Sequence, residues 1–217
     1  MNNGSAGPGR PYWLRPVPFS LILVGVTLCG CAGPPKREYV LGAPAFATTA
    51  SRAQTALPVV QVERVQLSDY LDSRDILTRG DGEVVPSQTG RWAERLSVGV
   101  TRALTASLAG RLAGVAVTSG QPIEPPVLRI LVDVIDFEAT MNQHVVLAAR
   151  WAVTDGSGRG SLIAEQASLI EPVAAPASDS AVVAAMSLAL ESLADRIAAG
   201  IGAAKVKGKM TSSGPGI

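Results

Sequence analysis

An apolar segment near the N-terminus limits which part of this chain can fold. Arg10 and Arg15 precede the apolar stretch 17–28, and Cys29-Gly30-Cys31 follows it. A basic head, a short apolar run and small residues at its end are typical of an export signal. The run is shorter than the roughly 20 apolar residues that cross a bilayer. Residues 1–30 are therefore predicted to be a signal peptide, and the folded part begins after them.

The cysteine that follows Gly30 predicts how the exported chain is held. A small residue followed by cysteine resembles the cleavage site of bacterial lipoproteins, which are cut before the cysteine and acylated on it. Cys31 is the expected lipid attachment site, because Cys29 as the anchor would place Leu28 where a small side chain is required. A plain secretory signal and an uncleaved membrane anchor are the alternatives.

Composition restricts what can stabilise the exported part. Both cysteines lie at the predicted cleavage site, so no disulfide can cross-link the domain, even in an oxidising compartment. Aromatic residues make up only 4% of the chain, so the core is expected to be aliphatic. The 19 basic and 18 acidic residues give no excess positive charge, and no nucleic-acid partner is expected.

The segment after the cysteine predicts a tether followed by strands. Residues 31–56 are expected to be a lipidated tether with one short strand at Tyr39-Val40-Leu41. Residues 57–67 are rich in valine and predict a strand with a bulge or an edge near Glu63-Arg64. Residues 75–79 and 83–85 flank Gly80-Asp81-Gly82, which predicts a hairpin.

The second half predicts a meander of three strands, at residues 127–137, 143–155 and 161–171. Their apolar residues alternate, which is typical of strands with one buried face. The segment Asp155-Gly156-Ser157-Gly158 between the last two is a hairpin turn signal.

Two further segments have the periodicity of amphipathic helices. In residues 89–112 an apolar residue recurs every four positions, and residues 181–199 repeat at spacings of three and four. Ser178-Asp179-Ser180 offers capping oxygens to the second helix, while Gly200 and Gly202 are predicted to end it. Residues 203–217 are expected to be a disordered tail.

These elements predict an α+β fold over residues 57–202. It is expected to be a two-layer structure, a mixed β-sheet with two main amphipathic helices packed on one face. The helices would cover the better-buried face of the strands.

Side chains suited to catalysis are few. His144 is the only histidine, and Cys31 is the only cysteine expected in the mature chain. A zinc or iron site built from His and Cys ligands is therefore excluded. A Ser-His-Asp triad would need His144 with Ser157 or Ser161, and neither serine follows a strand in the turn that such hydrolases require. The sequence therefore predicts no enzyme, no metal and no cofactor, with a secreted hydrolase as an alternative.

Other polar and aromatic residues are interpreted as structural. Asp133 and Asp136 have opposite strand parity, and Glu138 lies near the end of the same strand, which favours a solvated strand face over a glycosidase pair. Trp92 and Trp151 fall on apolar stripes and are predicted to be core residues.

Several ordered segments together resemble the PqiC-type family of ABC-transport auxiliary lipoproteins, which accompany MCE-type intermembrane transport systems. The resemblance covers roughly residues 39–112. The segments that carry it are Tyr39-Val40-Leu41, Val62 to Asp72, Asp75 to Arg79 and Arg91 to Leu96.

The resemblance implies a non-enzymatic subunit that is lipid-anchored at the periplasmic face of the outer membrane. Such a subunit docks the periplasmic MCE-type protein of an inner-membrane permease system. It supports the transport of lipids or hydrophobic compounds and the integrity of the envelope, and it forms ring-like homo-oligomers. Ala32 agrees with outer-membrane sorting, because aspartate after the cysteine is the usual signal for the inner membrane. A structural envelope lipoprotein that binds peptidoglycan or an outer-membrane assembly machine is the alternative.

The segment Ser68-Asp69-Tyr70-Leu71 lies between a predicted strand and Asp75 and is expected to be a loop. Tyr70 and Leu71 are predicted to project from it, so Asp69, Tyr70 and Leu71 are the candidate partner contact. The alternative is that Tyr70 and Leu71 close the edge of the core.

Replacing Cys31 with Ala is expected to abolish acylation, because the thiol that receives the lipid is lost. Metabolic labelling with a fatty acid in the native host measures this, and the Cys29→Ala variant is expected to keep its label. Labelling that persists in the Cys31→Ala chain would show that another residue carries the lipid.

Overall fold

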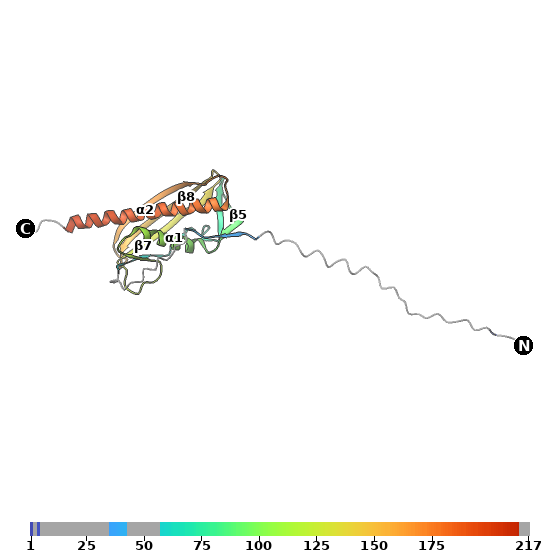
Figure 1. Cartoon of the computed structure of the whole chain (residues 1–217), viewed down its shortest axis with the longest axis horizontal. Coiled ribbons are helices and arrows are strands. Elements are labelled where there is room, and N and C mark those ends of the chain that lie inside the picture. Colours follow the sequence, from blue (N-terminus) through green and yellow to red (C-terminus); the bar gives the residue numbers. More distant parts are fainter. Residues whose placement is uncertain (2–3, 5–34, 43–56, 213–217) are drawn as a thin grey trace, which may run out of the picture. The chain divides into compact units, whose positions relative to one another are not determined.

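The computed structural model describes residues 1, 4, 35–42 and 57–212, with side chains up to Ala204. In this part of the chain, nine strands form one mixed sheet and two helices pack against it (Figure 1). The predicted α+β class and mixed sheet are confirmed. The elements in chain order are β1 (Arg37–Tyr39), β2 (Val59–Val62), β3 (Gln66–Leu67), β4 (Asp75–Gly80), β5 (Glu83–Trp92), α1 (Leu96–Arg111), β6 (Ala116–Thr118), β7 (Leu128–Thr140), β8 (His144–Asp155), β9 (Ser161–Pro172) and α2 (Asp179–Ser212).

Strand β7 organises the sheet because strands pair along both of its edges. On one edge it pairs antiparallel with β8, which pairs antiparallel with β9, so the predicted meander is confirmed. Along the other edge β2, β3 and β4 pair with β7 one after another, all in the parallel sense. The sheet continues from β4 to β5 and β1, and from β2 to β6.

The valine-rich segment 57–67 contains a break, as predicted. Strand β2 ends at Val62 and β3 begins at Gln66, and the Val65 amide donates to Thr101 Oγ1 of α1, 3.0 Å away, instead of to a neighbouring strand. Strand β2 lies between β6 and β7, whereas β3 pairs with β7 alone, so the break lies where this segment becomes an edge of the sheet. It lets one segment of the chain pair twice with the same long strand.

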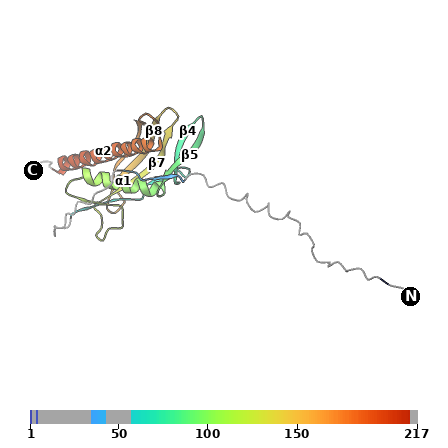
Figure 2. The same cartoon turned by 45° about the vertical axis from the view of Figure 1, so that its right-hand side comes forward.

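Both helices cover the same face of the sheet. The core-facing residues of β8 are Val145, Leu147, Ala149, Trp151 and Val153, all at most 4% exposed. Their neighbours on the other face are exposed or half-buried, except Thr154, which is buried. Helices α1 and α2 lie side by side over the buried face (Figure 2), which confirms the predicted two-layer arrangement.

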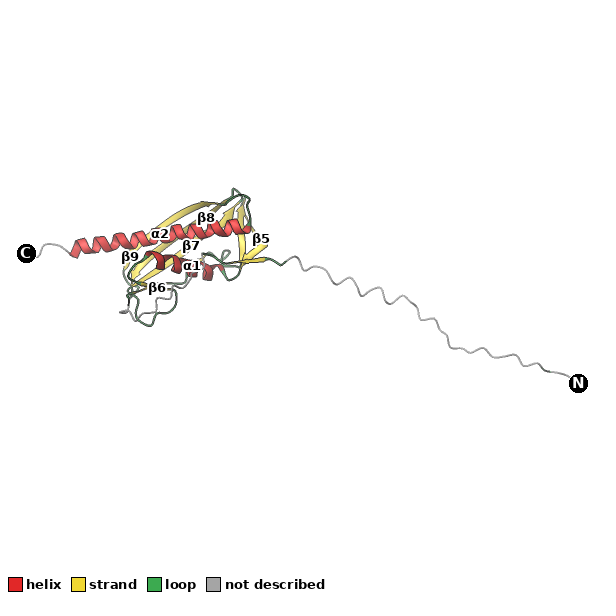
Figure 3. Ribbon diagram, viewed as in Figure 1, coloured by secondary structure: helices red, strands yellow, loops and turns green. Residues whose placement is uncertain are grey.

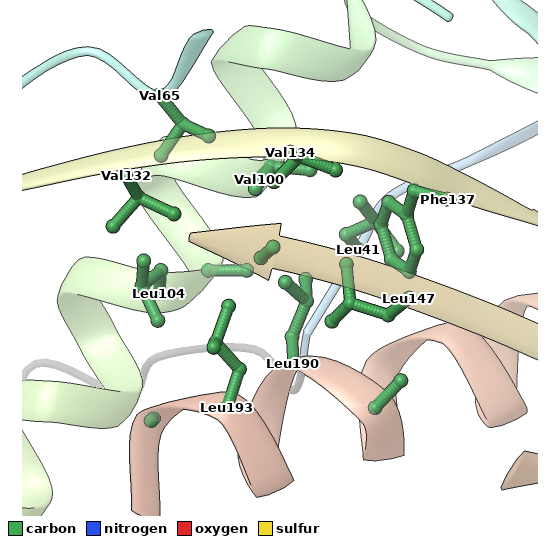
Figure 4. Packing of buried hydrophobic residues seen from close by; sticks show 14 of the residues in the cluster. Leu41, Val65, Val100, Leu104, Val132, Val134, Phe137, Leu147, Leu190 and Leu193 are labelled. Carbon is green, nitrogen blue, oxygen red and sulfur yellow. The ribbon is translucent and has the colours of Figure 1, made fainter. Parts of the chain in front are cut away.

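The core between the layers is aliphatic. Leu104 of α1 and Leu190 and Leu193 of α2 are at most 1% exposed. Figure 4 shows them directed toward Val132 of β7 and Leu147 of β8. Burial of each such side chain contributes about 1.5–3 kcal/mol, so the domain needs no disulfide to hold its layers together.

The hairpin between β4 and β5 follows from its turn residues. Asp81 and Gly82 connect the strands with φ values of 45° and 82°, both in the left-handed region. A two-residue turn of this kind matches the twist of the flanking strands. The predicted hairpin is confirmed, although β5 is longer than expected and continues to Trp92.

Helix α1 begins at Leu96, not at Thr89 as the sequence predicted. Thr89 to Trp92 extend β5 instead, and the Trp92 amide donates to Arg74 O at 2.7 Å. Trp92 is buried as expected, but it reaches the core from a strand. Trp92 and Leu96 are four residues apart, as in a helical stripe, but Trp92 belongs to β5 and only Leu96 belongs to α1.

A distant loop caps the N-terminus of α1. The Asp72 carboxylate accepts a hydrogen bond of 3.1 Å from the Ser97 amide. Burial raises the pKa of Asp72, but the hydrogen bonds from Ser97 and the positive charges of Arg95 and Arg64 together hold it below its usual value. A carboxylate at this position also interacts favourably with the helix dipole.

Helix α2 continues through Gly200 and Gly202 to Ser212, so the predicted end at Gly200 and the predicted start of the tail at residue 203 are wrong (Figure 3). Ile201 follows Ile197 by one turn and is only 3% exposed. This continued burial outweighs the cost of glycine in a helix, about 1 kcal/mol. In the part of the chain with described structure, no helix is both long and apolar enough to span a membrane.

Replacing Leu104 with Asp is expected to unfold the domain, because an unpaired charge would enter the aliphatic layer. Circular dichroism during thermal denaturation measures this. The matched control is Val98→Asp, at a position of the same helix that is 38% exposed, and it is expected to melt close to the parent. Equal melting of the Leu104→Asp variant and the parent would contradict the packing of α1.

Candidate functional site

A bulge in β7 gathers polar side chains on the face of the sheet that the helices leave uncovered, here called the open face. The register of β7 against β8 shifts between Val134 and Asp136. Asp133 pairs with Arg150, and Asp136 with Ala148, so the two aspartates share this face. The sequence analysis placed them on opposite faces because it assumed regular alternation along the strand. That prediction is wrong, since the extra residue of the bulge shifts the alternation by one position.

A polar cluster forms where the loop before β4 crosses this face. The Arg79 guanidinium donates from Nε to Glu138 Oε1 and from Nη2 to the Tyr70 hydroxyl at 2.6 Å. The Tyr70 hydroxyl donates to Asp136 Oδ1 at 3.3 Å, and Arg79 lies 3.8 Å from the same oxygen. The guanidinium carbon is 5.4 Å from the centre of the Tyr70 ring, within the range of a cation–π contact. We call Tyr70, Arg79, Asp136 and Glu138 the tyrosine–arginine cluster.

Burial shapes the electrostatics of the cluster. Desolvation, with the nearby Glu138 carboxylate, raises the pKa of Tyr70 to about 12, so the phenol stays protonated and can donate to Asp136. The hydrogen bond to Glu138 raises the pKa of Arg79 above its ordinary value. One cation thus faces two carboxylates, and the cluster carries an excess negative charge.

Glu138 is the unusual member of the cluster. Its side chain is only 3% exposed, and Oε2 has no hydrogen-bond partner among the described residues. The sequence analysis interpreted Glu138 as part of a solvated face, which is wrong because Tyr70 and Arg79 come from another segment of the chain. Sequence reasoning also missed Arg79; the one available signal was a carboxylate between Phe137 and Ala139 in an apolar strand.

The predicted contact loop is only partly available to a partner. Asp69 is exposed and Tyr70 is 42% exposed. Leu71, in contrast, is fully buried, so the prediction that it projects is wrong and its side chain closes the edge of the core. The predicted lipid site, Cys31, lies outside the described residues.

The rest of the open face is a mixed surface. Ile135 at the bulge is 46% exposed, and Ile170 of β9 is 63% exposed. A shallow trough of about 550 Å³ lies farther along β7, β8 and β9, lined by residues 131–133, 150–152 and 164–166. The ion pair between Arg150 and Asp133, at 2.6 Å, lies on its floor. Exposed aliphatic side chains beside charged ones are typical of protein interfaces.

The catalytic arrangement that the sequence left open is not formed. His144 begins β8, whereas Ser157 follows the other end of that strand and Ser161 begins β9 beside it. Twelve residues of strand separate the ends of β8 by roughly 35–40 Å. Among the described residues, no three His, Asp or Glu side chains are placed to hold a metal ion.

A family comparison matches most of the folded part. The model of the ABC-type transport auxiliary lipoprotein component matches residues 39–198, from β1 through most of α2. The chain belongs to this family. The family resemblance noted in the sequence is thereby confirmed, and the match extends through the second half of the domain. No curated protein sequence matches the chain.

Two solved structures share the fold of this auxiliary lipoprotein. One is an uncharacterized protein with 20% sequence identity and a TM-score of 0.64, covering 77% of this chain and 99% of its own. The other is protein XCC0632 from Xanthomonas campestris, with 16% identity and a TM-score of 0.57, covering 82% of this chain and 97% of its own. At these identities the likeness establishes the fold.

Replacing Arg79 with Met is expected to lower the free energy of unfolding by about 2–3 kcal/mol, because it leaves Glu138 buried without its cation. Breaking a buried pair costs about 3–5 kcal/mol, and the 40% exposure of the Arg79 side chain reduces that cost. Urea denaturation measures the change.

The control is the double variant Arg79→Met with Glu138→Met, which removes both charges and is expected to recover most of the loss. A single variant as stable as the parent would show that Glu138 does not depend on Arg79.

Proposed function

We propose that this auxiliary lipoprotein is a non-enzymatic, outer-membrane subunit of an MCE-type transport system for lipids or hydrophobic compounds. The family match over residues 39–198 carries the proposal, together with the signal that ends before Cys31. In this function Cys31 bears the acyl chains and the domain stands on the periplasmic side of the membrane. More than one acyl chain makes such anchoring durable.

The proposed partner is the periplasmic MCE-type protein of the system, which connects to the inner-membrane permease. Docking it would keep the transport path continuous across the periplasm and so support envelope integrity. The proposal includes assembly of several copies into a ring-like homo-oligomer, which would present the same docking face repeatedly.

The open face is the proposed docking surface. Asp69, Asp136 and Glu138 outnumber Arg79 at its polar end, so a partner with lysine or arginine side chains is electrostatically complementary. The exposed Tyr70 offers an aromatic ring with a polar end, a residue type enriched at interfaces. The aliphatic side chains of Ile135 and Ile170 supply the apolar part of the contact.

Site-specific photocrosslinking in the native host tests the docking surface. A photoreactive amino acid at Asp69 of the full-length, lipidated chain is expected to capture the MCE-type protein, identified by mass spectrometry. The control position is Leu188 on α2, which is 56% exposed and faces away from the sheet, and it is expected to capture far less.

A charge reversal adds a second measurement. Asp69→Lys is expected to reduce co-purification of the MCE-type protein, whereas Glu124→Lys, in an exposed loop away from the open face, is expected to leave it unchanged. Recovery of cell-wall material or of an outer-membrane assembly machine in place of the MCE-type protein would contradict the proposal and favour the structural alternative.

A further inference from the structure

Helix α2 extends past the strands at one end of the sheet (Figure 3). An apolar cavity of about 460 Å³ opens at this end. It lies on the helix side of the sheet, between the start of β2, the end of α1 and the body of α2. All twelve residues that line it are Pro, Val, Ala, Gly, Leu or Ile. We call this space the end cavity.

The end cavity has the properties of a site for a hydrocarbon chain. Its walls give water no side-chain hydrogen-bond partner, and cavities of that kind take up apolar molecules. Its volume falls within the range of roughly 300–1,000 Å³ found for ligand pockets. Val127 and Leu162 at its mouth are 49% and 55% exposed, so an apolar entrance faces the solvent.

A polar groove adjoins the cavity between β9 and α2, and Gly200 lies at the junction. A Cβ atom on Gly200 would be 3.6 Å from Ile163 Cδ1, which lines the cavity, and 3.6 Å from Glu165 Oε1, which lines the groove. Gly200 thus lies next to a residue of each, so the cavity and the groove are neighbours along β9 and α2.

The groove presents groups that suit a charged headgroup. Its volume is about 490 Å³, and Trp151 and Arg196 line it together with Glu165. The Trp151 side chain is 4% exposed and its Nε1 atom is fully buried, so this residue contributes only a wall to the groove. Arg196 is exposed and forms no ion pair with a described acid.

We propose that this end of the domain binds a phospholipid, with one acyl chain in the end cavity and the headgroup in the adjoining groove. The phosphate accepts from the Arg196 guanidinium, since hydrogen bonds from a guanidinium to an anion are among the strong ones. The Glu165 carboxylate faces an ammonium group of the headgroup. A phospholipid that carries both charges, such as phosphatidylethanolamine, therefore fits best.

This site goes beyond the docking proposal and does not depend on it. The end cavity and its groove lie on the helix side, whereas the tyrosine–arginine cluster lies on the open face. Loss of the MCE-type partner would leave the phospholipid site intact, and a negative result here would leave the docking surface untouched.

Photoaffinity labelling tests the proposal. Full-length protein purified from its host's membranes is incubated with phosphatidylethanolamine that carries a diazirine near the end of one acyl chain. After irradiation, mass spectrometry is expected to find the adducts on peptides that contain Val127 or Leu162. Labelling spread evenly over peptides with Ile170 or Leu188, which are also exposed apolar residues, would overturn the proposal.

Variants at the mouth of the end cavity test the acyl-chain site. Leu162→Asp is expected to reduce adduct yield about tenfold, because it places a charge where the chain enters, and Ile170→Asp on the same strand is the matched control. Ala113→Trp, at an exposed position of the cavity wall, is expected to fill the space and reduce the yield too. If Leu162→Asp lowers the melting temperature of the protein, the labelling of the Ala113→Trp variant is the deciding measurement. Unchanged labelling in a folded variant would overturn the acyl-chain site.

The headgroup contact is tested with a second probe. Arg196→Glu is expected to reduce labelling by the phospholipid but not by a diacylglycerol with the same diazirine chain, because only the phospholipid carries a phosphate. Arg37→Glu, on the distant strand β1, is the control and is expected to change neither. Equal effects of Arg196→Glu on both probes would overturn the headgroup site.

Discussion

The burial of one face of the β7–β8–β9 meander under α1 and α2 is the interaction on which the structure depends. Both cysteines of the chain precede the folded part, so no covalent cross-link shares this task. The contact is made mainly of Leu, Val, Ile and Ala side chains from strands and helices that are far apart in sequence, joined by Phe137, Trp151 and Met186. Because both helices of the described residues lie on this face, neither of them covers the opposite face of the sheet.

The uncovered face is where the polar chemistry of the domain gathers. The bulge at Ile135 turns Asp136 and Glu138 to that face, where they meet Tyr70 from the loop before β4 and Arg79 from β4 itself. A buried glutamate is stable there only because Arg79 neutralises it. The tyrosine–arginine cluster leaves a negatively charged surface with an exposed tyrosine at one end of a face that also carries exposed aliphatic side chains. That combination underlies the proposed docking of a basic partner.

The two proposed sites lie on opposite sides of the sheet and would bind different partners. The open face would hold a protein partner, while the end cavity under α2 would hold the chain of a lipid. The extension of α2 helps to form the lipid site, because burial of Ile201 keeps the helix in place beyond Gly200 and completes the cavity wall. A transport subunit with both properties would contact its cargo as well as position its partner.

The sequence alone determined the class of the fold, the meander, the buried face of β8 and the apolar stripes of the helices. These follow from local periodicity, because the geometry of a strand or a helix decides which residues share a face. Family membership was also readable, since ordered segments carry it. The tertiary structure decided where α1 begins, how far α2 extends, and that Leu71 and Glu138 are buried. Those outcomes depend on partners distant in the chain: Asp72 for the helix start, β9 for the helix extension, and Arg79 for the buried carboxylate. No local pattern encodes such contacts, so the tyrosine–arginine cluster and the end cavity emerged only when the elements were packed together.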